Sequence, residues 1–311
     1  MNPLRQMPLI NSVFKTLVLA LAFCFSGNLA AENEPEQTGL NWMQALPDEK
    51  ALRQIIIPGT HNTVAHFEPW PHSAACQKLE LAEQLEAGIR FLDLRCRHLN
   101  DDFLLYHGAV SQKQTFDQAI ATLSDFLTHN PSETVIVSIA GAAKAKGNSS
   151  SFETTLRAKL KKQEELWYQK EKLPKLEDAR GKLVLFRRFN SEKALGFDAS
   201  QWPHAGYNTS KSLWVQDRFR PSSSEKKWEF VENSFTHVLA KQPTAPQTLF
   251  LNYTSGYLSG RAGIPNITAV SKHVNPLLLA YLEKAPHRPH GVLVVDHVDE
   301  KLAKAIYGLN F

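Results

Sequence analysis

The stretch Arg53-Gln54-Ile55-Ile56-Ile57-Pro58-Gly59-Thr60-His61-Asn62 joins a β-branched apolar run to a polar turn. Three consecutive isoleucines are typical of a strand that is buried on both faces. The Pro-Gly pair that follows marks a turn, and His61 comes soon after it. This stretch therefore predicts a core strand over 53–58 that delivers a titratable side chain just beyond its carboxyl end.

Seven further apolar runs repeat this pattern along the chain, and most are separated by helical patterns. The runs are 89–95, 103–107, 134–139, 182–189, 212–219, 248–253 and 291–298. The predicted helices are 79–87, 115–129, 151–172, 225–241, 270–284 and 300–307. Alternating strands and helices with buried strands favour an α/β fold with a largely parallel sheet. Seven or eight such units favour a TIM-type barrel, and a doubly wound open sheet is the alternative.

The amino-terminal segment is predicted to be removed rather than to fold. Residues 1–31 hold two basic residues and no acid, then a short apolar run at 16–25 and a small-residue exit. These are the features of a signal peptide, and an uncleaved amphipathic anchor is the alternative. Residues 32–39 are polar and predicted to be flexible, and 40–311 form one domain without a Gly/Ser linker. We therefore expect an exported protein, secreted or periplasmic.

Composition excludes several classes of protein and leaves the state of two cysteines open. Of the 311 residues, 43% are hydrophobic and 21% are charged, as in an ordinary globular protein. The net charge of +4 is too small to predict nucleic-acid binding. Removing the leader takes Cys24 with it and leaves Cys76 and Cys96. We predict a disulfide between these two in an oxidising compartment, and two buried thiols are the alternative.

Titratable side chains recur at the carboxyl ends of the predicted strands. The set is His61, Asp93, Arg95, His107, Arg188, Asp217 and Asp296. In a barrel these ends converge on one face, where catalysis takes place. Each residue alone has an ordinary structural reading, such as an ion pair between Asp93 and Arg95 on one face of their strand. Together they are better explained as a site, because a core strand would otherwise leave these charges unpaired.

The chemistry of this set is acid–base catalysis around an anion. Two histidines can divide proton transfer, one removing a proton and the other giving one. Arginine suits a phosphate because its planar fork bonds two oxygens and stays charged. Phosphodiester cleavage needs these parts, and arginine can stabilise the developing charge without a metal. The sequence contains no HExxH, GxGxxG, Walker A or GxSxG motif.

At this point the chain resembles the X-domain family of bacterial phosphatidylinositol-specific phospholipase C. The resemblance is collinear over nearly the whole chain after the leader, and the ordered set of motifs is more specific than any single one. The motifs are Asn41-Trp42-Met43-Gln44, Ile57-Pro58-Gly59-Thr60-His61, 91–97, Tyr106-His107-Gly108, Asn130-Pro131-Ser132-Glu133-Thr134, 178–185, Val215-Gln216-Asp217, Leu251-Asn252-Tyr253-Thr254-Ser255 and Val295-Asp296.

The resemblance implies a distorted barrel that cleaves phosphatidylinositol to diacylglycerol and a cyclic inositol phosphate. It implies that His61 is the general base for the inositol 2-hydroxyl and that Asp296 orients it. His107 would be the general acid, and Arg95 would stabilise the phosphate while Asp93 supports the site. Arg188 and Asp217 would hydrogen-bond the inositol hydroxyls.

Three positions depart from the family pattern. Asn62 stands where an acid partners the general-acid histidine, so we expect the amide to orient that ring without stabilising its charged form. Ala140 replaces a lysine that contacts substrate, and Phe219 keeps the stacking surface of a phenol but loses its hydroxyl. The His-Asn pair also resembles calcium-dependent relatives, but Arg95 occupies a position where they need an acid. We therefore predict a metal-independent enzyme without a cofactor.

The substrate class implies contact with a membrane. Phe67 and Trp70 follow His61, and Tyr257 and Leu258 follow a later strand, so these side chains are predicted to form an apolar rim that contacts lipid. Packing of Trp70 beneath its own loop is the alternative. We expect a monomer at phosphatidylinositol-containing surfaces. A non-catalytic binder of inositol lipids and a barrel acting on another glycerophosphodiester are the alternative functions.

Overall fold

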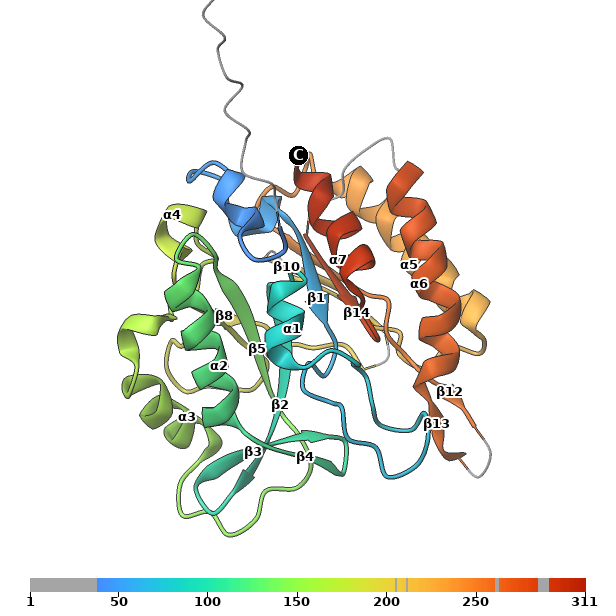
Figure 1. The fold of residues 1–311 in the computed structure, drawn as a ribbon. Helices are drawn as coiled ribbons and strands as arrows, with labels where there is room; N and C mark the ends of the chain where they lie inside the picture. Colours follow the sequence, from blue (N-terminus) through green and yellow to red (C-terminus); the bar gives the residue numbers. More distant parts are fainter. Residues whose placement is uncertain (1–37, 205, 211, 261–262, 285–290) are drawn as a thin grey trace, which may run out of the picture. The chain divides into compact units, whose positions relative to one another are not determined.

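Parallel strands form a curled sheet whose neighbours follow the order of the chain (Figure 1). They are β1 (Ile56–Thr60), β2 (Phe91–Leu99), β5 (Val135–Gly141), β7 (Leu183–Arg187), β10 (Leu213–Gln216), β11 (Leu249–Tyr253) and β14 (Gly291–Val295). The computed structural model describes residues 38–311, except 205, 211, 261–262 and 285–290. The predicted signal peptide, and the predicted flexible segment up to residue 37, lie outside the described residues.

The first and last parallel strands pair directly, which distinguishes a barrel from a doubly wound sheet. Ile56 of β1 stands opposite Gly291 of β14, and the pairing continues to Thr60 and Val295. Within the described residues, the far ends of the sheet do not pair with each other. One end carries β6 (Trp167–Tyr168) and β8 (Phe197–Asp198) beside β7, and the other carries β9 (Tyr207–Thr209) beside β10. The result is a distorted, incompletely closed α/β barrel in a single domain, which confirms the predicted fold class.

Side chains alternate between the barrel interior and the layer beneath the helices. In β1, Ile57 packs inside the barrel while Ile56 packs against the surrounding helices. In β14, Val294 and Val295 divide in the same way. Successive strand residues point to opposite faces, so an unbroken apolar run is what burial on both faces requires.

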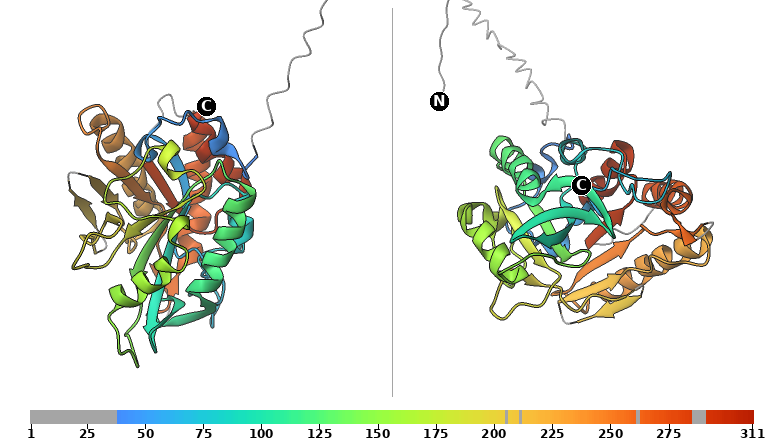
Figure 2. Two further views of the ribbon diagram at one scale, coloured as in Figure 1. Left: turned by 90° about the vertical axis from the view of Figure 1, so that its left-hand side faces the viewer. Right: turned by 90° about the horizontal axis from the view of Figure 1, so that it is seen from below.

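Helices cover the outside of the sheet, with α2 and α3 on one flank and α5 and α6 on another (Figure 2). The helices are α1 (Leu81–Glu86), α2 (Phe116–His129), α3 (Phe152–Lys161), α4 (Leu176–Ala179), α5 (Ser224–Lys241), α6 (Ile267–Lys284) and α7 (Glu300–Tyr307). Local sequence sets their starts, as where the Thr115 side chain accepts a hydrogen bond from the Gln118 amide at α2. The predicted helix over 151–172 is too long. After Lys161 the chain passes through the 3₁₀ turn η3 (Glu164–Leu166), and the aromatic pair of β6 then joins β7.

The first residues that the structure describes cover the amino ends of the barrel strands. The 3₁₀ turns η1 (Trp42–Ala45) and η2 (Leu52–Gln54) bury Trp42, Met43 and Leu52 beneath the barrel. The Trp42 ring stacks on Tyr307 of α7 and donates a hydrogen bond to the Gly88 carbonyl at 2.9 Å. A last 3₁₀ turn, η5 (Gly308–Asn310), follows α7. With this end closed, access to the barrel interior is from the carboxyl ends of the strands.

The predicted strand at 103–107 forms, but it is not a strand of the parallel barrel. It belongs to β3 (Asp102–His107), which runs antiparallel to the long strand β2 and pairs with β4 (Val110–Thr115). This hairpin extends beyond the carboxyl ends of the barrel strands (Figure 1). Because β3 runs back from the tip of β2, His107 still arrives at the site end of the barrel, by a route that the sequence pattern did not predict.

The predicted disulfide is wrong, because Cys76 and Cys96 are both free and buried. Cys96 lies on β2 and packs in the large apolar cluster beneath the helices. Cys76 lies in the loop before α1 and packs with Ala65 and Ile267. The two thiols thus belong to separate apolar clusters, and each behaves as a small buried hydrophobe.

Candidate active site

His61 and Asp296 meet because the strands that precede them are neighbours. Thr60 and Val295 are opposite each other in the register of β1 and β14, so the next residue of each chain segment reaches the same point. Asp296 Oδ1 lies 2.8 Å from His61 Nδ1. The Gln77 side-chain amide fixes this junction, since it donates to the carbonyls of both His61 and Val295 at 2.9 Å.

Asn62 contacts the other nitrogen of the same ring. Its Nδ2 lies 2.9 Å from His61 Nε2, so Nε2 accepts this bond and Nδ1–H donates to Asp296. Asn62 has a positive φ of 41°, a conformation that asparagine tolerates better than most residues. The expectation that Asn62 orients His107 is therefore wrong, because its amide is directed at His61.

His107 faces His61 from the hairpin side of the site. The two ring centroids are 6.0 Å apart and the rings are nearly perpendicular. His107 Nδ1 lies 2.8 Å from the Ala74 carbonyl, which makes Nδ1–H the donor and leaves Nε2 without its proton in the neutral ring. Burial, together with repulsion from His61 and Arg95, lowers the pKa of His107 to about 4.

Asp93 is buried between two guanidinium groups. Its Oδ2 lies 2.9 Å from Arg95 Nη2 on the same face of β2, and its Oδ1 lies 3.1 Å from Arg188 Nη1 just after β7. Burial alone would raise the pKa of Asp93, but Arg95 and Arg188 outweigh it and hold the pKa far below its usual value. One carboxylate therefore fixes two cations at the mouth of the barrel.

These groups line one pocket of about 460 Å³. Trp202 forms part of its wall: Arg188 lies over the indole ring at 3.5 Å from the centroid, and the indole N–H donates to Asp217 at 2.9 Å. The residues in the wall are His61, Arg95, His107, Gly108, Arg188, Trp202, Pro203, His204, Asp217, Phe219, Arg220, Gly256, Tyr257, Pro265, Ile267 and Asp296. The predicted site residues from different strands thus share one cavity, apart from Asp93 and Asn62, which support it from behind.

Several polar atoms at this end of the barrel lack a hydrogen-bond partner within the described structure. They include Arg188 Nε, the Tyr253 hydroxyl and the hydroxyl of Ser138, which is opposite Asp93 in the register of β2 and β5. Buried polar groups are normally satisfied. Their gathering beside Asp93 and Arg188 indicates a site arranged to bind a polar ligand. Ala140, two residues beyond Ser138, stands opposite Arg95 and adds no charge.

The predicted rim residues differ in exposure. The side chains of Trp70 and Phe67 are 62% and 40% exposed, so Trp70 does not pack beneath its own loop. Tyr257 is partly buried in the pocket wall, and Leu258 of β12 (Leu258–Ser259) packs partly against the core. The ribbon formed by β12 and β13 (Pro265–Asn266) lies at the same end of the molecule as the β3–β4 hairpin (Figure 1). None of the described helices is long and apolar enough to cross a membrane.

Sequence reasoning missed the residues that hold the site from loops. Trp202 lies in a stretch with no strand or helix pattern, and nothing in its neighbourhood indicates that it contacts Arg188 and Asp217. Thr63 accepts a hydrogen bond from the Asp93 amide at 2.8 Å and so ties the loop after β1 to β2. The contact between Thr63 and Asp93 could be predicted from the sequence only if β1 and β2 were already known to be neighbours.

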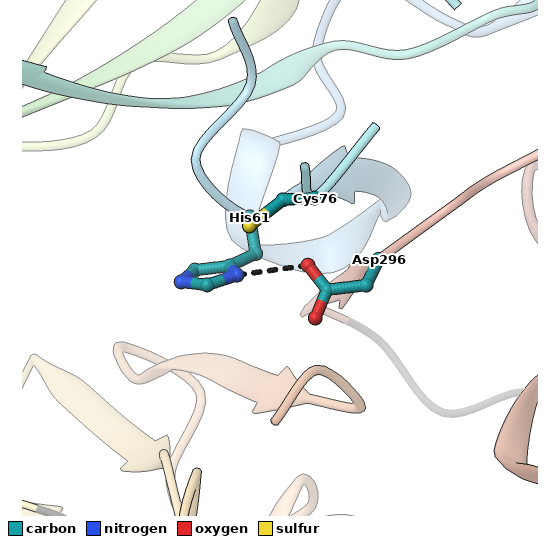
Figure 3. Close-up of side chains that lie close together, drawn as sticks. All are labelled: His61, Cys76 and Asp296. Atoms are coloured by element: carbon teal, nitrogen blue, oxygen red, sulfur yellow. Dashed lines mark hydrogen bonds and ion pairs between the residues drawn. The ribbon is translucent and has the colours of Figure 1, made fainter. Parts of the chain in front are cut away.

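A third side chain, Cys76, lies beside His61 and Asp296 (Figure 3). One potential ligand atom from each of the three lies within 4.8 Å of the others. A metal ion can be held where at least three histidine, cysteine or acidic side chains lie close together. Among the described residues, His61, Cys76 and Asp296 form such a group. Cys76 lies in a loop, and the sequence pattern did not predict that its side chain would lie beside His61 and Asp296.

The chain is similar in sequence to known bacterial proteins. Residues 52–189 match the family model described as phosphatidylinositol-specific phospholipase C, X domain. A protein of Listeria monocytogenes named 1-phosphatidylinositol phosphodiesterase is 27% identical over 95% of this chain and 97% of its own length. A Staphylococcus aureus protein of the same name is 25% identical over 93% of each chain.

Solved structures agree in fold. The Listeria monocytogenes phosphatidylinositol-specific phospholipase C superposes with a TM-score of 0.69 at 24% identity, over 88% of this chain and 99% of that one. A double mutant of the Staphylococcus aureus phosphatidylinositol-specific phospholipase C gives a TM-score of 0.78 at 22% identity, over 86% and 97% of the two chains. The matched X domain holds both histidines and the Asp93 cluster, and it lies within a likeness that extends over nearly the whole chain. Residues 52–189 therefore match the X domain of phosphatidylinositol-specific phospholipase C, and the chain is similar over nearly its whole length to bacterial proteins named 1-phosphatidylinositol phosphodiesterase.

Proposed function

We propose that the protein is a phosphatidylinositol-specific phospholipase C that acts by paired histidine catalysis without a metal. The single observation that supports this most strongly is that His61 and His107 face one pocket that also contains Arg95 and Arg188. A phosphodiester placed in this pocket would have a proton acceptor, a proton donor and two cations around it. The curated relatives named above carry the same activity in their names.

In the first step the inositol 2-hydroxyl attacks phosphorus while His61 removes its proton. The acceptor is Nε2, because Nδ1 holds a proton that it donates to Asp296. Asn62 must give up its bond to Nε2 as the hydroxyl takes its place. Asp296 then stabilises the imidazolium that forms, in the manner of the carboxylate in a catalytic triad. A new P–O bond closes the cyclic phosphate.

The same step breaks the bond between phosphorus and the diacylglycerol oxygen. His107 donates a proton from Nε2 to that oxygen, so the lipid leaves as a neutral alcohol. In the free protein the low pKa of His107 leaves this nitrogen without a proton at neutral pH. The negative phosphate of the substrate, bound beside the ring, would favour the protonated form and load the acid when it is needed. Arg95 balances the charge that develops on the phosphate oxygens.

The site does not fit a catalytic calcium ion. Calcium binds through several carboxylate and carbonyl oxygens. Asp93 is the one acidic residue of β2, and both its oxygens are engaged by Arg95 and Arg188. The guanidinium groups therefore occupy the place and supply the positive charge that a calcium ion would provide, which supports a reaction that needs no metal or other cofactor.

The inositol ring would lie against the far wall of the pocket. Arg188 and Asp217 are held there by Trp202 and offer a donor and an acceptor for ring hydroxyls. Phe219 offers an apolar surface beside them. Asp93 and Arg188 are tied together, so binding of inositol and positioning of the phosphate would be coupled through one carboxylate.

The substrate would be reached at a membrane surface outside the cytoplasm. We propose export by the leader at 1–31, with the mature protein secreted or periplasmic and acting as a monomer that does not bind nucleic acid. Exposed Phe67 and Trp70, together with Tyr257 and Leu258, would contact lipid at the rim. The net charge of +4 falls to +2 without the two basic residues of the leader, and so small a charge leaves the apolar rim as the main source of membrane binding.

The test is cleavage of phosphatidylinositol in mixed micelles by the purified protein, in the presence of EDTA. We expect release of diacylglycerol at the same rate with and without the chelator. A rate that appears only on addition of calcium or magnesium would overturn the metal-free mechanism and favour a metal-dependent glycerophosphodiesterase. Binding of the lipid without turnover, unchanged in His107→Ala, would instead show a non-catalytic inositol-lipid binder.

A further inference from the structure

The thiol of Cys76 has no place in the reaction, yet it is buried against the catalytic dyad. Its sulfur lies within 4.8 Å of the ligand atoms of His61 and Asp296. Figure 3 shows the three side chains close together. Its backbone amide donates to the Ala65 carbonyl at 2.8 Å, so the loop holds the sulfur in place. Burial and the nearby Asp296 raise the pKa of this thiol well above its usual value. A thiol in this state is a poor nucleophile, which argues against a covalent or redox role.

The atoms around the sulfur are those that zinc prefers. Zinc is bound by thiolate sulfur, imidazole nitrogen and carboxylate oxygen in a tetrahedral arrangement. Here a thiol, an imidazole and a carboxylate converge. His107 lies outside this group of three, and its Nδ1 would have to leave the Ala74 carbonyl to become a fourth donor. His107 Nδ1 lies 3.8 Å from the Cys76 sulfur, close to the separation of about 3.6 Å between sulfur and nitrogen on a tetrahedral zinc ion.

The charges of this cluster also fit a divalent cation. The thiolate and the Asp296 carboxylate together carry two negative charges when a metal displaces the thiol proton. Arg95 is the cation nearby, and its charge is offset by its ion pair with Asp93 at 2.9 Å. The pocket reaches His61, His107 and Asp296 from solvent, which gives an ion a route to the cluster.

We propose that Cys76, His61, Asp296 and His107 form an inhibitory zinc site built into the catalytic centre. Zinc replaces the proton on the Cys76 sulfur, which leaves as H⁺. The proton on His61 Nδ1 moves to Nε2, where a rotated Asn62 side-chain amide can accept it through its oxygen, and His107 makes the same Nδ1-to-Nε2 change. The metal then bonds to sulfur, two Nδ1 atoms and one carboxylate oxygen, with no oxidant or reductant involved.

Zinc bound in this way stops catalysis by consuming the groups that catalysis needs. His61 Nε2 is protonated and cannot accept a proton from a hydroxyl, and Asp296 is no longer free to stabilise the imidazolium. Metal binding itself does not depend on the proposed reaction, but its inhibitory effect rests on that reaction. Zinc would therefore act as an inhibitor, and the metal-free protein would be the active form.

The site can be tested on the wild-type protein without any substitution. Metal-stripped protein is loaded with one equivalent of zinc, and the zinc K-edge X-ray absorption is measured. We expect one sulfur at about 2.3 Å and nitrogen or oxygen neighbours at about 2.0–2.1 Å. Cobalt used as a probe should give a near-ultraviolet sulfur-to-metal charge-transfer band. A spectrum with nitrogen and oxygen neighbours alone would overturn the proposal, because it would place zinc on other side chains.

Substitution of the thiol tests the functional consequence. In Cys76→Ala, zinc should inhibit phosphatidylinositol cleavage at least about tenfold more weakly than in the wild type, each rate being compared with the metal-free rate of the same variant. Cys96→Ala is the matched control, since it removes the other buried thiol from a separate cluster and should keep zinc inhibition. Equal inhibition of Cys76→Ala and the wild type would overturn the proposal. If the protein has no activity at all, the absorption spectra still decide whether the site exists.

Discussion

Two buried ion pairs involve residues three apart at the start of β2, Arg90 and Asp93. One pair lies at the closed end of the barrel and the other at the open end. At the closed end, Arg90 Nε lies 2.8 Å from Glu133 Oε2, and both side chains are fully buried. At the open end, Asp93 is equally buried but pairs with Arg95 and Arg188, which reach into the pocket. The same kind of charge pair is therefore used once to close the fold and once to build a site.

The two pairs differ in how completely their polar atoms are satisfied. Arg90 donates to four backbone carbonyls besides Glu133, those of Leu85, Ile89, Gly39 and Leu40. The second oxygen of Glu133 accepts the Met43 amide at 3.0 Å. At the open end Arg188 Nε has no partner within the described structure. A closed network stabilises an arrangement of the chain, whereas an incomplete one at the same depth leaves donors available for a ligand.

The largest effect is expected from removal of a proton-transfer group at the open end. In His107→Ala, kcat for phosphatidylinositol should fall by about 10²–10⁴-fold, the usual contribution of a general acid. Steady-state cleavage measured alongside thermal unfolding checks this. A fall in rate that simply follows the fraction of unfolded protein would contradict it.

Substitutions at the closed end of the barrel should lower the stability of the protein rather than its catalytic rate. Arg90→Met leaves Glu133 as an unpaired buried charge, so we expect a loss of about 3–5 kcal/mol in the free energy of unfolding. Denaturant unfolding measures the loss, and kcat per folded molecule should stay near the wild-type value. The matched double variant Arg90→Met/Glu133→Leu removes both charges and should recover the part of the loss that is due to the unpaired charge, while the backbone groups that the two side chains bonded stay without partners. Equal destabilisation in the single and double variants would show that the pairing is not what matters.

The two buried acids should give opposite pH dependences of stability. Burial raises the pKa of Glu133 despite Arg90, so its folded form binds a proton more readily than the unfolded chain, and stability falls as the pH rises through this range. The pKa of Asp93 is depressed, so its contribution is present above the unfolded pKa near about 3.9 and is lost in stronger acid.

Comparison of Glu133→Gln and Asp93→Asn with the wild type isolates these contributions. Unfolding is measured in denaturant from acid below the ordinary aspartate pKa up to neutral pH. Glu133→Gln should remove part of the decrease in stability above the ordinary glutamate range, and Asp93→Asn should remove part of the decrease in stability as the pH falls below the ordinary aspartate range. Slopes of the same sign from the two positions would contradict the distinction between the two ends.

The smallest effect is expected at the rim, where no charge pair is involved. Trp70→Ala removes the most exposed large apolar side chain among the described residues. Partition to phosphatidylinositol-containing vesicles should weaken by roughly tenfold, as loss of 1–2 kcal/mol of apolar contact implies. A vesicle sedimentation assay measures this, and Leu277→Ala, which removes an exposed apolar side chain from α6, is the control that should bind as the wild type does.

The sequence predicted the fold best for strands whose residues are apolar on both faces. The runs that became β1 and β14 are apolar on both faces, so they could be placed in a barrel, and the residues after them, His61 and Asp296, had to share one end. The sequence was less informative about which strands pair with each other. The 103–107 run reads as a core strand whether it pairs in parallel or folds back in a hairpin, and only the tertiary structure decides between them.

The loops were beyond prediction for a physical reason. Loop conformation depends on contacts with distant residues, and a local pattern does not record them. Asn62 could bond either histidine, and the choice follows from the backbone at its positive φ. Cys76 could have paired with Cys96, but the two lie in different clusters. Trp202 gains its role only when β7 and β10 bring Arg188 and Asp217 together around it.

The most direct test of the account is the chemical form of the first phosphorus product. Purified protein is mixed with phosphatidylinositol micelles in EDTA, and the reaction is followed by phosphorus NMR. Attack by the inositol 2-hydroxyl, with His61 as base and His107 as acid, predicts that a cyclic inositol phosphate appears first and that any acyclic phosphate follows it. An acyclic inositol phosphate as the first product, with no cyclic species before it, would contradict the central claim.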